Sequence, residues 1–115
     1  MPDPLIMYII VDRSLEWGAG SIIAQCCHAT AKAISTFRLD ENVTEYLADV
    51  DAMRKVVLQA KTADQLLALS QSLADSGLDH VKWIEQPENI LVCLATKPIR
   101  KSTIGTVFKR FALYK

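Results

Sequence analysis

Four polar side chains with chemical potential fall at helical spacing between residues 21 and 32. Ser21, Gln25, His28 and Lys32 are four, three and four residues apart, which places them along one side of an α-helix. An imidazole on this side could transfer protons, and an amide one turn earlier could donate to a carbonyl oxygen. The rest of the segment is apolar, so we expect a largely buried helix. Its polar side then either lines a cleft or finds partners inside the protein.

A glycine-containing loop precedes this helix. Gly18 and Gly20 favour a tight turn with positive φ, and Ser21 is a favoured N-cap residue. The backbone N–H groups of Gly20 and Ser21, with the helix dipole, could hold a phosphate or a developing oxyanion. The loop lacks the lysine and spacing of a Walker loop and the third glycine of a dinucleotide-binding loop. A turn that only joins a strand to a helix is the competing interpretation.

A second group of polar residues surrounds Pro87. Glu85 and Glu88 flank this proline, and Asn89 follows. A carboxylate at the end of a strand could orient His28 or act as a general base for water. The alternative is the ordinary polarity of a turn.

The aromatic and sulfur-containing residues leave several roles open. Trp17, in the glycine loop, could stack on a nucleic-acid base or close the end of the core, whereas Trp83 is expected in the core. Cys26 and Cys27 point away from the polar side of the helix and are expected to pack rather than to act as nucleophiles. The two histidines and three cysteines lack the spacing of a zinc site, so we assign no metal.

Composition predicts a single domain over residues 1–115, and the charge is unevenly distributed. Half of the residues are hydrophobic and the net charge is zero. Residues 1–81 carry 6 basic and 11 acidic side chains, whereas residues 82–115 carry 7 basic and 2 acidic ones. The last third is therefore a candidate surface for an anionic partner, or else a solvated lysine-rich face. Its candidate phosphate contacts are Lys97, Arg100, Lys101, Lys109 and Arg110.

The absence of a membrane-spanning run, a secretion signal and paired cysteines predicts the cellular location. The longest apolar run, Leu5–Val11, has seven residues and is too short to span a bilayer. The first residues do not have the basic start and long apolar region of a secretion signal. Three cysteines form no paired framework. We expect a cytoplasmic protein with reduced thiols and no membrane partner.

Hydrophobic periodicity predicts four strands and four helices. The strands are expected at residues 5–11, 54–60, 80–86 and 90–95, the last two forming an antiparallel hairpin. Helices are expected at residues 21–37 and 40–50, after a capping box formed by Thr62 and Gln65, and beyond Pro98. The third helix should end at Gly77. The fourth is predicted from the spacing of Ile104, Val107, Phe108 and Phe111.

The order of these elements predicts the fold class. The sequence β-α-α-β-α-β-β-α is typical of an α/β three-layer sandwich. We expect a mixed four-stranded sheet with helices on both faces. The short tail at residues 112–115 is expected to be extended.

Residues 18–29 carry a resemblance to a known family. They read Gly-Ala-Gly-Ser-Ile-Ile-Ala-Gln-Cys-Cys-His-Ala. This segment resembles the signature of type 2 peptidyl-tRNA hydrolases, in which a glycine loop leads into a helix bearing Ala-Gln-x-x-His-Ala. The similarity continues through residues 54–58 and the C-terminal segments, so it covers about residues 6–114. Residues 83–90 and 111–115 are most similar to the branch called peptidyl-tRNA hydrolase domain-containing proteins.

The resemblance implies a function and a set of site residues. Members of the family hydrolyse the ester that joins a peptide to the ribose of a tRNA, so peptidyl-tRNA is the implied partner, with neither a metal nor a cofactor. Gln25 and His28 match the family's glutamine and histidine, and Glu85 falls where the family has an aspartate. His28 and Glu85 are expected to activate water. The expected substrate contacts are Gln25, Asn89, Lys32 and the amides of Gly20 and Ser21, with Lys97, Arg100 and Lys101 on RNA phosphates.

The sequence departs from the family pattern at three places. The family's lysine at the start of the helix is here Ser21. The second active loop is shortened to residues 85–89, without a clear counterpart of its threonine, and the Arg-x-Asp after the first strand is replaced by residues 12–14. Three hypotheses remain open. The protein is a peptidyl-tRNA hydrolase, a catalytically weak or inactive module that binds tRNA or a protein, or a structural homodimer subunit with an apolar helix face as its interface.

Overall fold

The strand β1 (Leu5–Asp12) lies at the centre of the fold. In the computed structural model, which describes residues 2–115, every residue of β1 is buried, and even Asp12 at its end is only 2% exposed. An eight-residue strand without an exposed position must be covered on both faces. The prediction of a central strand here is confirmed, and the strand extends one residue further than predicted.

The remaining strands form a mixed sheet around β1. The strand order is β3-β4-β1-β2-β6, and β5 pairs with the beginning of β1. β2 is parallel to β1, whereas β4 is antiparallel to both β1 and β3. The predicted mixed sheet and its hairpin are confirmed, but two strands of two residues each raise the number of strands from the expected four to six. The strands are β2 (Lys55–Ala60), β3 (His80–Glu85), β4 (Ile90–Thr96), β5 (Ile99–Arg100) and β6 (Ala112–Leu113).

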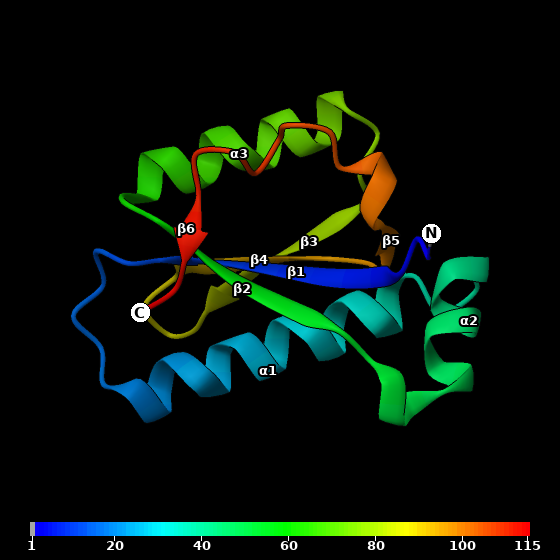
Figure 1. Cartoon of the computed structure of the whole chain (residues 1–115). Coiled ribbons are helices and arrows are strands. Elements are labelled where there is room, and N and C mark those ends of the chain that lie inside the picture. The colour runs from blue at the N-terminus through cyan, green and yellow to red at the C-terminus, as the bar shows by residue number, and fades with distance from the viewer. Residues whose placement is uncertain (1) are drawn as a thin grey trace.

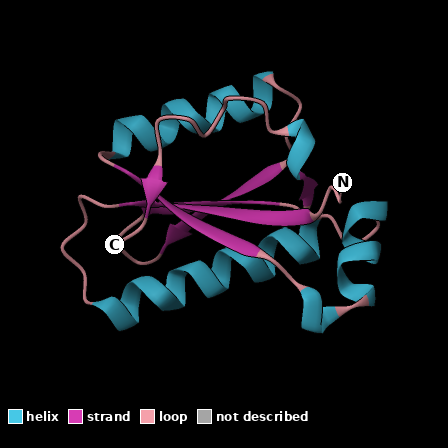
Figure 2. Cartoon of the chain, in the orientation of Figure 1, coloured by secondary structure: helices cyan, strands magenta, loops and turns pink. Residues whose placement is uncertain are grey.

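Helices cover both faces of the sheet. Figure 1 shows α1 (Ala19–Thr36) and α2 (Glu41–Ala48) on one side and α3 (Ala63–Asp75) on the other. The same three layers are visible in Figure 2, where the strands run between the helices. The predicted three-layer α/β sandwich is therefore confirmed. Within residues 2–115, none of the helices combines the length and apolar character needed to cross a membrane.

Alternation along β1 divides the core into two halves. Met7, Ile9 and Val11 belong to the cluster that packs under α1, whereas Tyr8 and Ile10 belong to the cluster that packs under α3. Successive side chains of a strand point to opposite faces, so one apolar run supplies both clusters. Each helix must then bury one apolar stripe against its own face of the sheet.

The start of α1 differs from the prediction. The helix begins two residues before Ser21, and Gly18 occupies the N-cap position with φ −63° and ψ 156° and no side-chain cap. Ser21 therefore lies inside the first turn. The backbone of this loop does not use positive φ, and the glycines that do are Gly77 and Gly105. An extended N-cap residue already turns the chain into the helix, so no left-handed residue is required.

α1 is also less buried than its composition suggests. The helix lies on a sheet face, so it buries a single stripe and leaves most other positions accessible. Ile23, for example, is 62% exposed. The buried positions are Ile22, Gln25, Ala29 and Ala33.

The ends of α3 follow their sequence signals. The Thr62 hydroxyl accepts a hydrogen bond from the backbone N–H of Gln65 at 3.1 Å, as predicted for a capping box. The side chain of Gln65 accepts from the N–H of Lys61 rather than from that of Thr62. Gly77, with φ +69°, ends the helix, and the N–H of Leu78 donates back to Leu73 at 2.8 Å.

The predicted fourth helix is wrong. β5 is followed by a short 3₁₀ helix, η2 (Lys101–Thr103), and then by consecutive turns. These turns are closed by i→i+3 hydrogen bonds such as Val107 to Ile104 and Phe111 to Phe108. Gly105 has φ +55°, which interrupts any continuous helix. The apolar spacing still places Phe108 in the core, where its ring stacks on Tyr8 at 4.6 Å between centroids.

Asp40 attaches α2 to the sheet through two contacts. Its Oδ1 accepts from the N–H of Asn42 at 2.8 Å and caps the helix, and its Oδ2 accepts from the Lys97 ammonium at 2.6 Å. The hydrogen bond from Lys97 lowers the pKa of the Asp40 carboxyl below its ordinary value of 3.8. A lowered carboxyl pKa stabilises the folded state above that value, and the gain is lost as pH falls through the lowered pKa. The observed helix α2 is shorter than the predicted helix at residues 40–50, and the short 3₁₀ helix η1 (Val50–Ala52) follows it.

Replacing Asp40 separates the two contacts. We expect Asp40→Ala to lower the free energy of unfolding by about 1–2 kcal/mol at pH 7, because both the cap and the ion pair are removed. Asp40→Asn keeps a capping oxygen and should lose less. Urea unfolding measured from pH 7 down to pH 2 should show wild type and Asp40→Asn converging in acid, where Asp40 is protonated. Equal stability of Asp40→Ala and wild type at pH 7 would contradict this role.

Candidate active site

The polar side of α1 faces β3, the outer strand next to β4. Gln25, His28 and Lys32 each contact a residue of β3. The Lys32 ammonium, for example, donates to the backbone oxygen of Lys82 at 2.8 Å. Three of the four residues of the pattern found in the sequence therefore have partners on one neighbouring strand, whereas within residues 2–115 Ser21, at the start of the helix, has no such partner.

Gln25 connects the helix to two side chains of β3. Its Oε1 accepts from the indole N–H of Trp83 at 2.6 Å, and its Nε2 donates to Oε2 of Glu85 at 2.9 Å. The indole nitrogen can only donate, so the amide oxygen must face Trp83 and the amide nitrogen must face the carboxylate. Gln25 is only 4% exposed. These two hydrogen bonds therefore fix the position of the Glu85 carboxylate through the buried side of the site.

His28 lies one helical turn beyond Gln25. Its side chain is exposed, and its ring lies against that of Trp83 with centroids 4.9 Å apart and planes tilted by 31°. Among residues 2–115, no hydrogen bond joins His28 to Glu85. Residues one turn apart on a helix have Cβ atoms about 5–6 Å apart, so the imidazole lies next to Gln25, whose amide holds Glu85.

A shallow hollow opens beside Glu85. It has a volume of about 430 Å³ and lies between the beginning of α1 and the β3–β4 hairpin. Both segments lie at the same end of the sheet in Figure 1. Its lining contains two carboxylates and no basic side chain. The lining residues are Trp17, Gly18, Ser21, Glu85 and Glu88.

The first turn of α1, which borders this hollow at Gly18 and Ser21, has backbone N–H groups without a partner in the helix. The first hydrogen bond of the helix runs from the N–H of Ile22 to the oxygen of Gly18 at 3.1 Å. The N–H groups of Gly20 and Ser21 precede it and have no acceptor in the helix. They are available to an oxyanion or a phosphate group, supported by the helix dipole.

The other predicted substrate contacts lie outside the hollow. Asn89 has φ 58° in the hairpin turn, and its side-chain oxygen accepts from Gln86 at 3.1 Å. Lys32 lies 11 positions after Ser21, about 16 Å along the helix. Neither side chain lines the hollow, and their contacts with a substrate stay predictions.

The predicted phosphate contacts lie at the opposite end of the sheet. Lys97 pairs with Asp40 at 2.6 Å and with Asp79 at 3.1 Å, and Arg100 pairs with Glu45. Two of these ion pairs connect β5 and the residues before it to α2 and its N-cap, and the third connects Lys97 to the residue before β3. Lys101 is exposed and forms no ion pair within residues 2–115. The structure does not bring Lys97, Arg100 and Lys101 to the hollow, and their role on RNA also stays a prediction.

The thiols are distributed differently from the expectation. Cys26 is half-buried and Cys93 is buried, but Cys27 is exposed rather than packed. The Cys93 thiol donates to the backbone oxygen of Gln25 at 3.6 Å. Its interaction with the Cys26 thiol lowers the pKa of Cys26, and the same interaction together with burial raises the pKa of Cys93. Within residues 2–115, no three His, Cys, Asp or Glu side chains gather as they would around a metal ion.

A serine and a histidine form a pair that sequence reasoning missed. The Ser70 hydroxyl lies 2.7 Å from Nε2 of His80, whose Nδ1 lies 3.1 Å from the carbonyl oxygen of Leu78. The carbonyl requires a proton on Nδ1, so in the neutral imidazole Nε2 accepts from the hydroxyl. Ser70 is only 7% exposed and joins α3 to β3 on the other face of the sheet. No sequence spacing indicates this pair, and its position makes it a structural contact.

Comparison with known proteins shows which family the protein belongs to and which proteins it is similar to. The model of the family "Peptidyl-tRNA hydrolase PTH2" matches residues 5–114, so this α/β sandwich belongs to that family. The human protein "Putative peptidyl-tRNA hydrolase PTRHD1" is 38% identical over 119 residues, which covers 99% of this chain and 85% of that protein. Its mouse counterpart of the same name is 35% identical over the same shares. The "Peptidyl-tRNA hydrolase" of Methanothermobacter thermautotrophicus is 26% identical over 95 residues, covering 78% and 82%.

The hydrogen bond of Trp83 can be measured directly. The chain has two tryptophans. We expect the indole N–H of Trp83 to exchange with water more slowly than that of Trp17, because the former donates to a buried amide. In Gln25→Ala, the Trp83 signal should lose this protection and shift upfield in a ¹H–¹⁵N spectrum. Unchanged exchange and shift in the variant would show that the amide is not held in this way.

Proposed function

We propose that this protein hydrolyses the ester between a peptide and the ribose of a tRNA by attack of water, without a metal. Membership of the peptidyl-tRNA hydrolase family supports the substrate class. The observation that carries the proposal is the carboxylate of Glu85, held by Gln25 at 2.9 Å beside a hollow with open backbone N–H groups. A peptidyl-tRNA substrate also supports a cytoplasmic location.

The proposed mechanism uses Glu85 as the general base. Glu85 takes a proton from a water molecule in the hollow, and the hydroxide forms a bond to the ester carbonyl carbon. The negative charge on the former carbonyl oxygen is held by the N–H groups of Gly20 and Ser21. Collapse breaks the bond to the ribose oxygen, which takes back the proton that Glu85 had accepted. Gln25 is a positioning residue here, because it is buried behind the carboxylate.

The hollow also predicts that the reaction is slow. Glu85 and Glu88 both line it, and no cation offsets the charge that develops on the oxyanion. The family's lysine would stand where Ser21 stands, and Lys32 is too far along the helix to replace it. Electrostatic stabilisation of an oxyanion is worth several kcal/mol in comparable sites. We therefore propose an active but slow enzyme.

Basic residues away from the hollow would hold the body of the tRNA. Lys101, Lys109 and Arg110 are exposed and are proposed to contact phosphates, together with Lys97 and Arg100 where their ion pairs allow. Such binding should weaken steeply as salt concentration rises.

A second function is supported by the same electrostatics. A hollow without a cation, together with the exposed basic residues Lys101, Lys109 and Arg110 elsewhere on the surface, also suits a module that binds tRNA or a protein partner without catalysis. This alternative keeps the family fold and lacks ester release. A homodimeric structural subunit remains the third hypothesis, and sedimentation decides it.

Ester release tests the proposed catalytic groups. The protein is incubated with N-acetyl-aminoacyl-tRNA, and release of the acetylated amino acid is followed. We expect Glu85→Gln to reduce the rate about a hundredfold, because a general base contributes factors of this size. Glu88→Gln is the matched control, since it removes the same charge from the same hollow but from a side chain that Gln25 does not hold. Wild type releasing no more than the His28→Ala, Glu85→Ala double variant would reject catalysis in favour of the binding module.

Adding the missing cation tests the electrostatic argument. We expect Ser21→Lys to raise the rate of ester release at least about tenfold, because a positive charge then faces the developing oxyanion. Ala24→Lys is the matched control, an exposed position on α1 that does not line the hollow. If both variants raise the rate equally, the gain reflects general attraction of tRNA and the argument about the hollow is wrong.

A further inference from the structure

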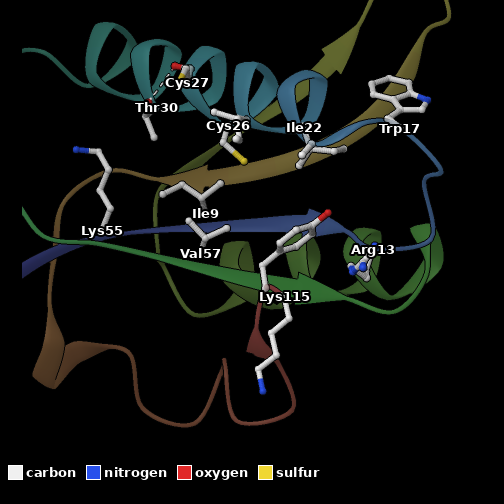
Figure 3. Close-up of a pocket in the computed structure, with 13 residues that line it drawn as sticks. Ile9, Arg13, Trp17, Ile22, Cys26, Cys27, Thr30, Lys55, Val57 and Lys115 are labelled. Carbon is white, nitrogen blue, oxygen red and sulfur yellow. Dashed lines mark hydrogen bonds between the residues drawn. The ribbon is translucent and has the colours of Figure 1, made fainter.

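A second and larger pocket lies on the opposite side of α1. Its volume is about 740 Å³, and it is bounded by α1 on one side and by β1, β2 and the C-terminal residues on the other. Figure 3 shows Ile22 and Cys26 pointing from the helix toward Ile9 and Val57 of the sheet. α1 rests mainly over β3 and β4, so the β2 side of this sheet face is left open. The walls of this groove are therefore apolar.

The charged groups of the groove all have the same sign. Arg13, Lys55 and Lys115 line it, and no acidic side chain does. The Arg13 guanidinium lies 5.1 Å from the ring centre of Tyr114, and the Lys55 ammonium donates to the hydroxyl of Tyr46 at 3.1 Å. Within residues 2–115, none of the three cations pairs with a carboxylate. An occupant of this groove must combine apolar or aromatic surface with negative charge.

Trp17 connects the groove to the hollow. This side chain lines both, at the point where the chain enters α1. In Figure 3 it stands at the end of the groove where the helix begins. From Ala19 to Thr30 the groove follows α1 for about 17 Å. A flexible chain whose end lies in the hollow could therefore continue past Trp17 into the groove.

We propose that this groove binds the single-stranded 3′ end of the RNA substrate, an inference that rests on the proposed function for the identity of the RNA. Bases stack on aromatic and apolar walls, here supplied by Trp17, Tyr114 and the aliphatic side chains. Phosphates are paired by Arg13 and Lys55, whereas the Lys115 ammonium points away from α1 in Figure 3. An apolar peptide would contact the walls but leave these two cations without partners, so the charges favour RNA. The ester would then lie in the hollow, with the peptide leaving away from the groove.

A charge placed in the groove tests this assignment. Ile23 lines the groove and is 62% exposed, so Ile23→Glu adds a negative charge without opening the core. Ala24→Glu adds the same charge to the adjacent exposed position, which lines neither pocket. The probe is a fluorescently labelled, non-esterified single-stranded RNA tetranucleotide ending in CCA. We expect Ile23→Glu to weaken its binding at least about tenfold, and Ala24→Glu to weaken it less than about twofold.

The salt dependence gives a second readout. Arg13→Gln and Lys55→Gln should each reduce the slope of log K against log salt by about one, because each removes one phosphate contact. Urea unfolding of every variant identifies any loss of folding.

Two results would overturn the inference, and two others would separate it from the proposed function. Equal binding of the tetranucleotide by Ile23→Glu and Ala24→Glu overturns it. So does weakened binding of an N-acetylated apolar tripeptide, with RNA binding intact, in Ile23→Glu, because the groove then takes the peptide. If ester release is Glu85-dependent while the tetranucleotide does not bind, only the groove assignment fails. If the tetranucleotide binds in an Ile23-sensitive way without ester release, only catalysis fails.

Discussion

The buried amide of Gln25 is the interaction on which the two sides of α1 depend. Its oxygen accepts from Trp83 and its nitrogen donates to Glu85, so both ends of the amide are held by β3. Leaving a buried amide without these partners would destabilise the folded protein by roughly 1–3 kcal/mol. The pair of bonds therefore fixes the rotation of the helix about its axis. With that rotation fixed, the polar side of α1 lies along β3 and its apolar side is left open toward β2.

This arrangement gives the two sides of one helix opposite electrostatic character. The hollow at Glu85 and Glu88 is negative, whereas all the charged side chains of the groove on the other side are basic. The backbone N–H groups at the start of α1 lie where the two meet. A negatively charged chain is favoured on one side, and proton abstraction by a carboxylate is favoured on the other. The proposed substrate combines the two, because it is an anionic RNA chain with an ester at its end.

The fold was largely predictable where a local signal matched a single structure. The apolar run of β1, the capping box at Thr62 and the glycine after α3 each led to the observed element. The C-terminal segment shows where such reasoning fails. Apolar residues at i, i+3, i+4 and i+7 suit a helix, but consecutive turns with i→i+3 bonds place Phe108 and Phe111 on the core equally well. The positive φ of Gly105 decides between them, and periodicity does not report it.

The sequence by itself determined the family, the sandwich and the polar stripe on α1. It also placed a carboxylate at the end of the third strand. Only the tertiary structure decided that Gln25 is buried and bonded to Glu85, that His28 is exposed against Trp83, and that Lys97 is held in ion pairs far from the hollow. The reason is physical. Helical spacing fixes which side chains share a face, but the partner of that face depends on how the helix packs across strands distant in sequence.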